Sequence, residues 1–175
     1  MMISDELIIN NILVRNFTAL SDTEKESVLT WRNNINIRSW MYNNNTIVKS
    51  DHFSFIEKLK NDNHNFYFLI KKGAEELGVV YLNRIEYDTG TADIGIYSKP
   101  GIKGAGNTLM EMLIEIAFNK LKLNSLTAEV FCTNEKAVSL YQRFGFKKVN
   151  VVKHNTSRKI LVMKLNKLGM AAESI

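Results

Sequence analysis

The sequence predicts a single domain of the mixed α/β class, built in layers. Two observations support this prediction. The chain has 175 residues, of which 45% are hydrophobic and 23% are charged, which is an ordinary composition for a globular domain with a real core. Segments with the alternation of strands and segments with the periodicity of helices follow one another without a repeat, a low-complexity tract or a linker.

The composition also limits the cellular setting and the partners. A single cysteine, Cys132, excludes an internal disulfide framework, and we expect it to be a small buried strand residue. No apolar run approaches the roughly 20 residues that cross a bilayer, and the N-terminus lacks the pattern of a signal peptide. The net charge of +5 suits anionic ligands, but the lysines are scattered and form no basic stripe. We therefore expect a cytoplasmic protein without a metal, a nucleic acid or a membrane as partner.

The N-terminal part of the chain predicts one strand and two helices. Residues 10–20 alternate like a strand. Residues 21–34 predict a helix capped by Ser21 or Asp22, with acidic residues in its early turns. A second helix over residues 50–62 has Ser50 as its expected cap and an apolar face.

The remainder of the chain predicts strands and helices in alternation. Residues 65–88 form two strands joined by a turn at 73–76, and residues 93–97 form the next strand. A glycine-rich loop leads into a helix whose apolar stripe has i, i+3, i+4 spacing. A strand over 125–132, a helix over 134–145 that ends at Gly145, and two closing strands complete the order.

The glycine-rich loop contains Gly101, Gly104 and Gly106 between a strand and a helix. Such a loop can direct several backbone N–H groups at one point, and the helix N-terminus adds a positive dipole. The arrangement favours a phosphate site, although glycine loops also serve as plain turns. A dinucleotide-binding site is excluded, because the spacing is not G-x-G-x-x-G and no repeated βαβ series follows.

A second motif follows about 30 residues later. Residues 134–146 fit the pattern N-x-x-A-x-x-x-Y-x-x-x-G-F. With the glycine loop before it, this pattern resembles the acyl-CoA-binding core of the GNAT family, the Gcn5-related N-acetyltransferases. The resemblance implies one domain over residues 1–168 with a mostly antiparallel central sheet, a splayed pair of strands and helices on both faces, followed by a flexible tail at 169–175. The chain departs from the family at Gly101, where Gln or Arg is usual.

The resemblance implies acetyl-CoA as co-substrate, transferring its acetyl group directly to an amine. The implied binding residues are Ile96, Tyr97, Ser98, Ile102, Lys103, Gly104, Ala105, Gly106 and Asn134. The pantetheine arm would pair with residues 95–98, and loop amides from Ile102 to Gly106 would hold the pyrophosphate. Tyr141 would protonate the thiolate that leaves. The alternatives are that Tyr141 only packs on the sheet and that Asn134 is a helix cap.

The acceptor half carries a narrower resemblance. The block W-R-N followed by I-R-x-W-M, within residues 31–41, is similar to acetyltransferases of bacterial nonulosonic-acid pathways. It implies acetylation of the 4-amino group of a UDP-linked 4-amino-4,6-dideoxy-N-acetylhexosamine in pseudaminic acid biosynthesis, for glycosylation of flagellin or another surface glycan. The expected acceptor residues are Arg32, Trp40, Met41, Tyr42, His52, Phe55 and Tyr97. Aromatic rings suit a uracil and an apolar methyl edge, and arginine suits a diphosphate. The alternatives are a structural ion pair for Arg32, core packing for Trp40 and a capping or surface role for His52.

The attacking amine must also lose a proton. Glu129 lies in the carboxyl half of its strand, near the expected splay, and is our candidate base. The alternative is a glutamate that merely faces solvent. Two other functions remain open at this point: acetylation of ribosomal-protein or other peptide N-termini, and a non-catalytic acyl-CoA-binding module. The sequence does not indicate an oligomeric state.

Overall fold

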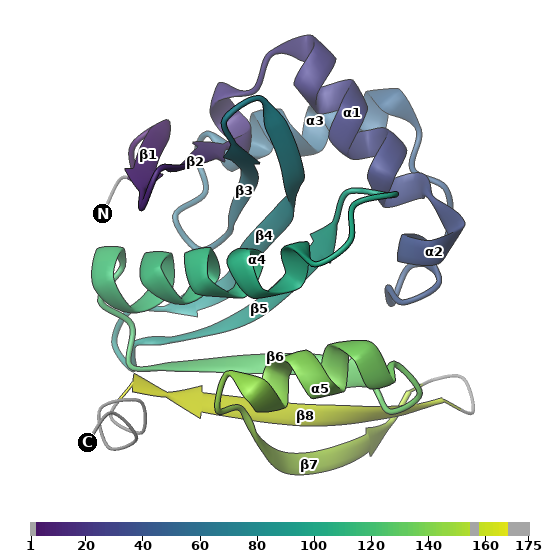
Figure 1. Ribbon diagram of the computed structural model, residues 1–175, viewed down its shortest axis with the longest axis vertical. Coiled ribbons are helices and arrows are strands. Elements are labelled where there is room, and N and C mark those ends of the chain that lie inside the picture. The colour runs from purple at the N-terminus through teal and green to yellow at the C-terminus, as the bar shows by residue number, and fades with distance from the viewer. Residues whose placement is uncertain (1–2, 155–157, 168–175) are drawn as a thin grey trace.

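The computed structural model describes residues 3–154 and 158–167, so the tail expected at 169–175 lies outside the described residues. Its centre is one eight-stranded sheet in the order β1-β2-β3-β4-β5-β6-β8-β7 (Figure 1). The strands are β1 (Glu6–Ile9), β2 (Ile12–Asn16), β3 (Phe66–Lys72), β4 (Glu75–Glu86), β5 (Thr91–Ser98), β6 (Ser125–Phe131), β7 (Lys147–Lys153) and β8 (Lys159–Asn166). Every neighbouring pair is antiparallel except β5 and β6, which confirms the mostly antiparallel sheet.

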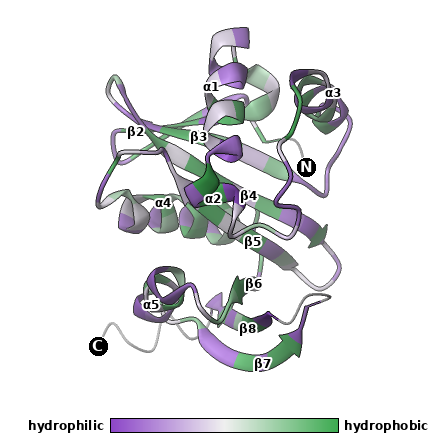
Figure 2. Cartoon of the chain, turned by 90° about the vertical axis from the view of Figure 1, so that its right-hand side faces the viewer, coloured by the Kyte–Doolittle hydropathy of each residue, from purple (hydrophilic) through white to green (hydrophobic). Residues whose placement is uncertain are grey.

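Helices cover both faces of this sheet, as the resemblance to the GNAT family implies. The helices are α1 (Asp22–Asn33), α2 (Ile35–Arg38), α3 (Lys49–Leu59), α4 (Ala105–Ile114), the π-helical segment η2 (Glu115–Lys120) and α5 (Glu135–Arg143), with a short 3-10 turn η1 (Phe17–Ala19). Figure 2 shows α1 and α3 on one side of β3 to β5 and α4 on the other. Alternate residues of β4 therefore enter two cores: Val79 packs beneath α1 and α3, whereas Val80 and Leu82 pack beneath α4.

The splayed pair of strands is β5 and β6. They pair in parallel only from Thr91 to Ile94 on β5 and from Ser125 to Ala128 on β6. Beyond Ile94, β5 continues to pair with β4 as far as Ser98, and β6 continues to pair with β8. The two strands thus diverge, and the backbone edge of β5 from residue 95 to residue 98 faces the gap (Figure 1).

The N-terminal strand predicted over residues 10–20 is wrong in extent. Only residues 12–16 of this range form a strand, which is β2, and β1 lies before the range. A two-residue turn at Asn10 and Asn11, whose φ angles are 49° and 63°, joins the two strands. Asparagine tolerates this left-handed region better than most residues, and such a turn matches the twist of a hairpin. The predicted strand ends in the 3-10 turn η1, which Asn16 caps because its side chain accepts a hydrogen bond from the Thr18 amide.

Helix caps were predicted with mixed success. Ser21 caps α1 in a full capping box with Glu24, as expected. The cap predicted at Ser50 is wrong, because α3 begins one residue earlier, after Val48, without a side-chain cap bond. Gly145 follows α5 with φ +81°, which confirms it as the residue that ends this helix. In the described part of the chain, no helix is long and apolar enough to span a membrane.

Candidate active site

The glycine-rich loop ends in a left-handed residue that starts α4. Gly104 is the N-cap, with φ +79°, and makes no side-chain cap bond. Backbone amides at the first turn of a helix have no acceptor within that helix. The amide of Ile102 is already used, because it donates to the carbonyl oxygen of Lys99 at 3.2 Å. The amides from Lys103 to Gly106 are therefore the ones that can hold an anion at this helix end.

Two cationic side chains near the loop have partners within the protein. The Lys99 ammonium pairs with Glu76 at 3.0 Å and lies 5.3 Å from the centre of the Trp31 ring. Arg143, on α5, instead donates to the side-chain oxygen of Asn107 in the first turn of α4, at 3.1 Å. The guanidinium from α5 thus brings a cation to the loop, which has glycine at position 101.

A large cleft of about 1300 Å³ runs along this loop and the gap between β5 and β6. Of the predicted acetyl-CoA residues, all but Ala105 line this cleft: Ile96, Tyr97, Ser98, Ile102, Lys103, Gly104, Gly106 and Asn134. The side chain of Ala105 is buried in the core instead. The volume and the open β5 edge suit a long ligand with a peptide-like arm.

Helix α5 forms the opposite wall of the cleft. Asn134 is its N-cap and accepts from the amide of Ala137, so the capping role is realised in the fold. Tyr141 is 5% exposed and meets Phe146 edge to face, with ring centres 5.2 Å apart. Burial raises the pKa of Tyr141, which keeps its hydroxyl protonated at neutral pH. The side chain therefore packs and still lines the cleft as a neutral proton donor.

A smaller cavity of about 330 Å³ adjoins the cleft on the α1 and α3 side of the sheet. All but one of the predicted acceptor residues line this cavity: Arg32, Met41, Tyr42, His52, Phe55 and Tyr97. The exception is Trp40. Trp40 lines the larger cleft. Met41, Tyr81 and Tyr97 line both spaces, so the two meet at these side chains.

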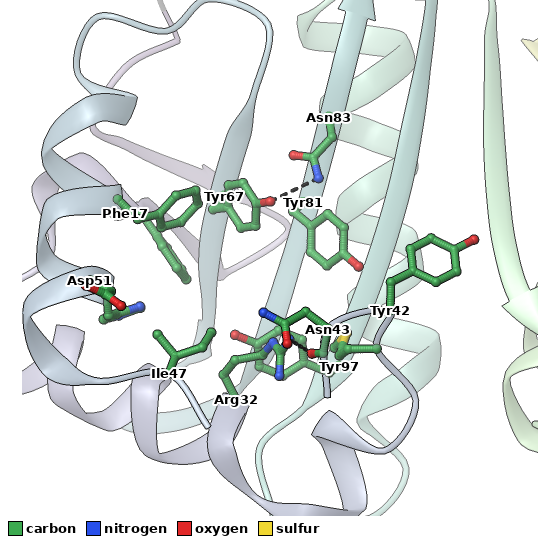
Figure 3. A pocket seen from close by; sticks show the side chains of 13 residues that line it. Phe17, Arg32, Tyr42, Asn43, Ile47, Asp51, Tyr67, Tyr81, Asn83 and Tyr97 are labelled. Carbon is green, nitrogen blue, oxygen red and sulfur yellow. Dashed lines mark hydrogen bonds between the residues drawn. The ribbon is translucent and has the colours of Figure 1, made fainter. Parts of the chain in front are cut away.

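Two of the three tyrosines that form one wall of the smaller cavity, Tyr67 and Tyr81, were not predicted from the sequence, whereas Tyr97 was. Tyr67 and Tyr81 lie opposite each other on β3 and β4 and stack with ring centres 5.1 Å apart. Figure 3 shows Tyr67, Tyr81 and Tyr97 together in this wall, with the Asn83 amide bonded to the Tyr67 hydroxyl at 2.9 Å. Gly95 faces Tyr81 on β5, and a Cβ there would come within 2.1 Å of the Tyr81 ring. Burial raises the pKa of Tyr81 to about 12.

Arg32 enters the smaller cavity from the last turn of α1. Its Nη2 donates to the carbonyl oxygen of Asn43 at 2.8 Å, and its buried Nη1 has no partner among the described residues. Burial lowers the pKa of Arg32, which nevertheless stays charged because an arginine titrates far above neutrality. The only other buried side-chain polar atom found without a partner in residues 3–154 and 158–167 is Oδ1 of Asn83, in the same cavity. A buried N–H or oxygen without a partner costs about 1–3 kcal/mol, so both atoms favour a bound ligand.

His52 and Phe55 reach the smaller cavity from α3. The buried Nε2 of His52 lies 3.1 Å from the carbonyl oxygen of Lys25, and burial lowers the pKa of this imidazole. Phe55 meets the Tyr67 ring edge to face at 5.1 Å. His52 is therefore an uncharged group at neutral pH that ties α3 to α1, and it does not cap its own helix.

Glu129 lies at the mouth of the gap and lines the larger cleft. The Tyr42 hydroxyl donates to its Oε2 at 2.5 Å. Figure 3 shows Tyr42 pointing away from the tyrosine wall. Nearby on β5, Asp93 pairs with Arg84, and burial raises the pKa of Asp93. The carboxylate of Glu129 is thus held at the larger cleft by Tyr42, which itself lines the smaller cavity.

Cys132 differs from its predicted place. It is exposed and follows β6 in a turn, rather than being buried within the strand. The strand ends at Phe131 because the chain turns there toward the cap of α5. No group of three or more potential metal-ligating side chains is found in the part of the chain that the structure describes.

The backbone at Gly104 supports a first prediction. Gly104→Val should lower the affinity for acetyl-CoA at least about tenfold, because a left-handed conformation costs a side chain about 1–2 kcal/mol and the branched group would stand beside the loop amides. Isothermal titration measures the affinity. Gly73→Val is the matched control, since Gly73 has φ +58° and, like Gly104, no atom within 4 Å of an added Cβ, but lies in the β3–β4 turn. Equal acetyl-CoA affinity in both folded variants would contradict the assignment of this loop as the phosphate-binding site.

Comparison with known proteins agrees with this geometry. Residues 12–147 match the family described as acetyltransferase (GNAT) domain. An acetyltransferase named PseH, from Campylobacter jejuni, is 37% identical over 135 residues, which is 77% of this chain and 84% of that protein. PseH from a second strain of this species is 33% identical over the same shares.

Solved structures agree as well. The crystal structure of C. jejuni N-acetyltransferase PseH in complex with acetyl coenzyme A has a TM-score of 0.72 and 31% identity, covering 89% of this chain and 99% of that one. Spermidine N-acetyltransferase from Vibrio cholerae, in complex with CoA and spermine, has a TM-score of 0.80 at 22% identity, covering 91% and 98%. The latter shows the fold alone. With the splayed sheet, the glycine loop and the match over residues 12–147, the chain belongs to the GNAT acetyltransferase family.

Proposed function

We propose that this protein transfers the acetyl group of acetyl-CoA to the 4-amino group of a UDP-linked 4-amino-4,6-dideoxy-N-acetylhexosamine, a step of pseudaminic acid biosynthesis. The observation that carries the proposal is the meeting of two spaces at Met41, Tyr81 and Tyr97. One space suits a long phosphate-bearing thioester, and the other suits an anionic aromatic acceptor.

Acetyl-CoA fits the larger cleft. The loop amides and the helix dipole of α4 would hold the pyrophosphate, and Arg143 stands beside them. The open backbone of β5 from residue 95 to residue 98 would pair with the amide groups of the pantetheine arm. The similarity to a PseH that was crystallised with acetyl coenzyme A supports this placement.

The smaller cavity favours a nucleotide sugar over a polyamine or a peptide. Arg32 and Asp51 both line this cavity, but Asp51 is exposed, whereas the buried guanidinium has an unused N–H donor for a phosphate oxygen. The unused oxygen of Asn83 accepts from an N–H group, which a uracil ring carries. The tyrosine wall offers flat apolar faces for a base or for the methyl edge of a deoxy sugar.

The reaction needs two proton movements at the junction. The neutral amine attacks the thioester carbonyl carbon, the C–S bond breaks, and the electron pair of that bond leaves on sulfur. Glu129 takes the proton that the nitrogen loses, directly or through a water, and Tyr141 donates its proton to the thiolate. Exchange with solvent restores both groups, so that one acetamide and one CoA thiol form for each acetyl-CoA consumed.

Inhibition by free UDP tests the acceptor assignment. UDP should compete with the amino-sugar substrate and leave the KM for acetyl-CoA nearly unchanged, because it would occupy the smaller cavity only. Initial rates at several UDP concentrations give both patterns, and uridine, which lacks the diphosphate, should inhibit much less. Robust acetylation of peptide N-termini with no inhibition by UDP would contradict the proposal.

A further inference from the structure

Part of the boundary between the two spaces is formed by a segment without regular secondary structure, which we name the acceptor loop (residues 39–45). It contains Trp40, Met41 and Tyr42, and Met41 is one of the side chains that line both spaces. From the N-terminal half of the chain, two arginines hold its backbone. Arg32 donates to the carbonyl oxygen of Asn43, and Arg38 donates to that of Asn44, at 2.8 and 2.6 Å.

A third arginine holds the acceptor loop from the opposite half of the molecule. Nη1 of Arg158, which immediately precedes β8, donates to the carbonyl oxygen of Ser39 at 3.0 Å. The Cζ of its guanidinium lies 3.5 Å from the centre of the Phe131 ring on β6 and 5.5 Å from the centre of the Trp40 ring. A guanidinium this close to aromatic faces is attracted to their π electrons. Arg158 therefore joins β6 to the first residues of the acceptor loop.

Tyr42 provides a second link between the acceptor loop and the C-terminal part of the sheet. Its ring stacks on His154, with centres 5.0 Å apart and planes 6° apart, and meets Phe131 edge to face at 6.0 Å. Its hydroxyl donates to Glu129. Trp40 and Tyr42 thus reach the C-terminal strands on both sides of Met41, and Phe131 lies in both connections.

We propose that Arg158 is a positioning residue for the acceptor: by clamping the acceptor loop to β6, it sets the places of Met41 and of the Tyr42 hydroxyl on Glu129. This inference rests on the proposed function for the identity of the acceptor, but not for the clamp itself. In the proposed complex acetyl-CoA lies mainly against residues of β5, α4 and α5, whereas Ser39, Trp40 and Met41 of the acceptor loop form a smaller part of the same cleft. The acceptor step should therefore depend on Arg158 far more than acetyl-CoA binding does.

The kinetic test compares Arg158→Ala with Lys159→Ala, its exposed neighbour at the start of β8. We expect Arg158→Ala to raise the KM for the amino sugar about tenfold and to lower kcat, which a loss of about 1.4 kcal/mol in positioning would produce. The Kd for acetyl-CoA should stay within twofold, and Lys159→Ala should change none of these values. Arg158→Lys should raise the KM for the amino sugar less than Arg158→Ala does, because lysine keeps the charge but lacks the planar group that stacks on Phe131.

A double-variant cycle distinguishes a clamp from a general loss of structure. If Arg158 acts through Trp40, then Trp40→Leu and Arg158→Ala together should raise the acceptor KM hardly more than either alone. Fully additive effects, or an equal loss of acetyl-CoA affinity, would overturn the proposal.

Hydrogen exchange tests the clamp without any substrate. Amides of the acceptor loop should exchange at least about fivefold faster in Arg158→Ala than in Lys159→Ala, while those of α4 remain unchanged, because loss of a tertiary contact lowers the cost of local opening. Unchanged exchange in the loop would overturn the clamp. Faster exchange in an enzyme that does not acetylate the amino sugar would instead support the clamp and contradict the proposed function. If Arg158→Ala fails to fold, Arg158→Gln takes its place in the same comparison.

Discussion

Tyr141→Phe should lower turnover by about 10²–10⁴-fold, which is the usual contribution of a positioned proton donor. The substitution removes the hydroxyl and keeps the ring, so the edge-to-face contact with Phe146 and the core around it should persist. Acetyl-CoA affinity should therefore change little. Stopped assays of CoA thiol release give the rate, and isothermal titration gives the affinity.

Tyr87→Phe is the matched control for this variant. Tyr87 is 38% exposed, and its hydroxyl donates to the carbonyl oxygen of Asn63, away from the cleft. Its loss should leave turnover within about twofold, as is typical of a surface group. If the rate of Tyr141→Phe remained within about threefold of the parent, then water would protonate the leaving thiolate, and the proposed role of Tyr141 would be wrong.

Arg32→Lys should raise the KM for the sugar nucleotide by about 10–100-fold, because a charge-assisted bond contributes about 1.5–3 kcal/mol and lysine cannot copy its two-point geometry. The KM for acetyl-CoA should stay nearly constant, since Arg32 lines only the smaller cavity. Steady-state kinetics with each substrate varied in turn separates the two constants.

Arg38→Lys is the control for that comparison. Arg38 also donates to a backbone carbonyl of the acceptor loop, at Asn44, but it does not line the smaller cavity. A shift in acceptor KM that is confined to Arg32→Lys would identify the guanidinium as a ligand group. Equal shifts in both variants would mean that the arginines act only by holding the loop.

The parts of the fold that depend on local signals were predictable from the sequence. The apolar stripe of α4, the capping box of Ser21 and the glycine at the end of α5 each depend on residues close together in the chain. The hairpin of β1 and β2 was missed because the predicted strand started at Asn10, inside the turn, and left β1 out, although two adjacent asparagines are a turn signal. The insertion of β8 between β6 and β7 is a property of long-range pairing, which local periodicity does not contain.

The contrast between local signals and long-range pairing also applies to the two halves of the candidate site. The predicted acetyl-CoA residues come from two compact motifs, and nearly all of them line one cleft. The tyrosine wall joins Tyr67, Tyr81 and Tyr97 from three strands, and only the register of those strands brings them together. Their alternation with buried residues was the one available signal. Trp40 shows the converse, because an aromatic residue in a loop gives no indication of which space it will line.

Acetylation of the purified UDP-4-amino-4,6-dideoxy-N-acetylhexosamine tests the central claim most directly. The enzyme should consume acetyl-CoA and this sugar in equal amounts, with a product that is heavier by one acetyl group placed on the 4-nitrogen by NMR. Peptides with free N-termini and spermidine, assayed at the same concentration, should react at least about 100-fold more slowly, as expected when a buried polar site meets the wrong partner. Acetylation of a peptide or of spermidine at a rate equal to or above that of the sugar would contradict the account.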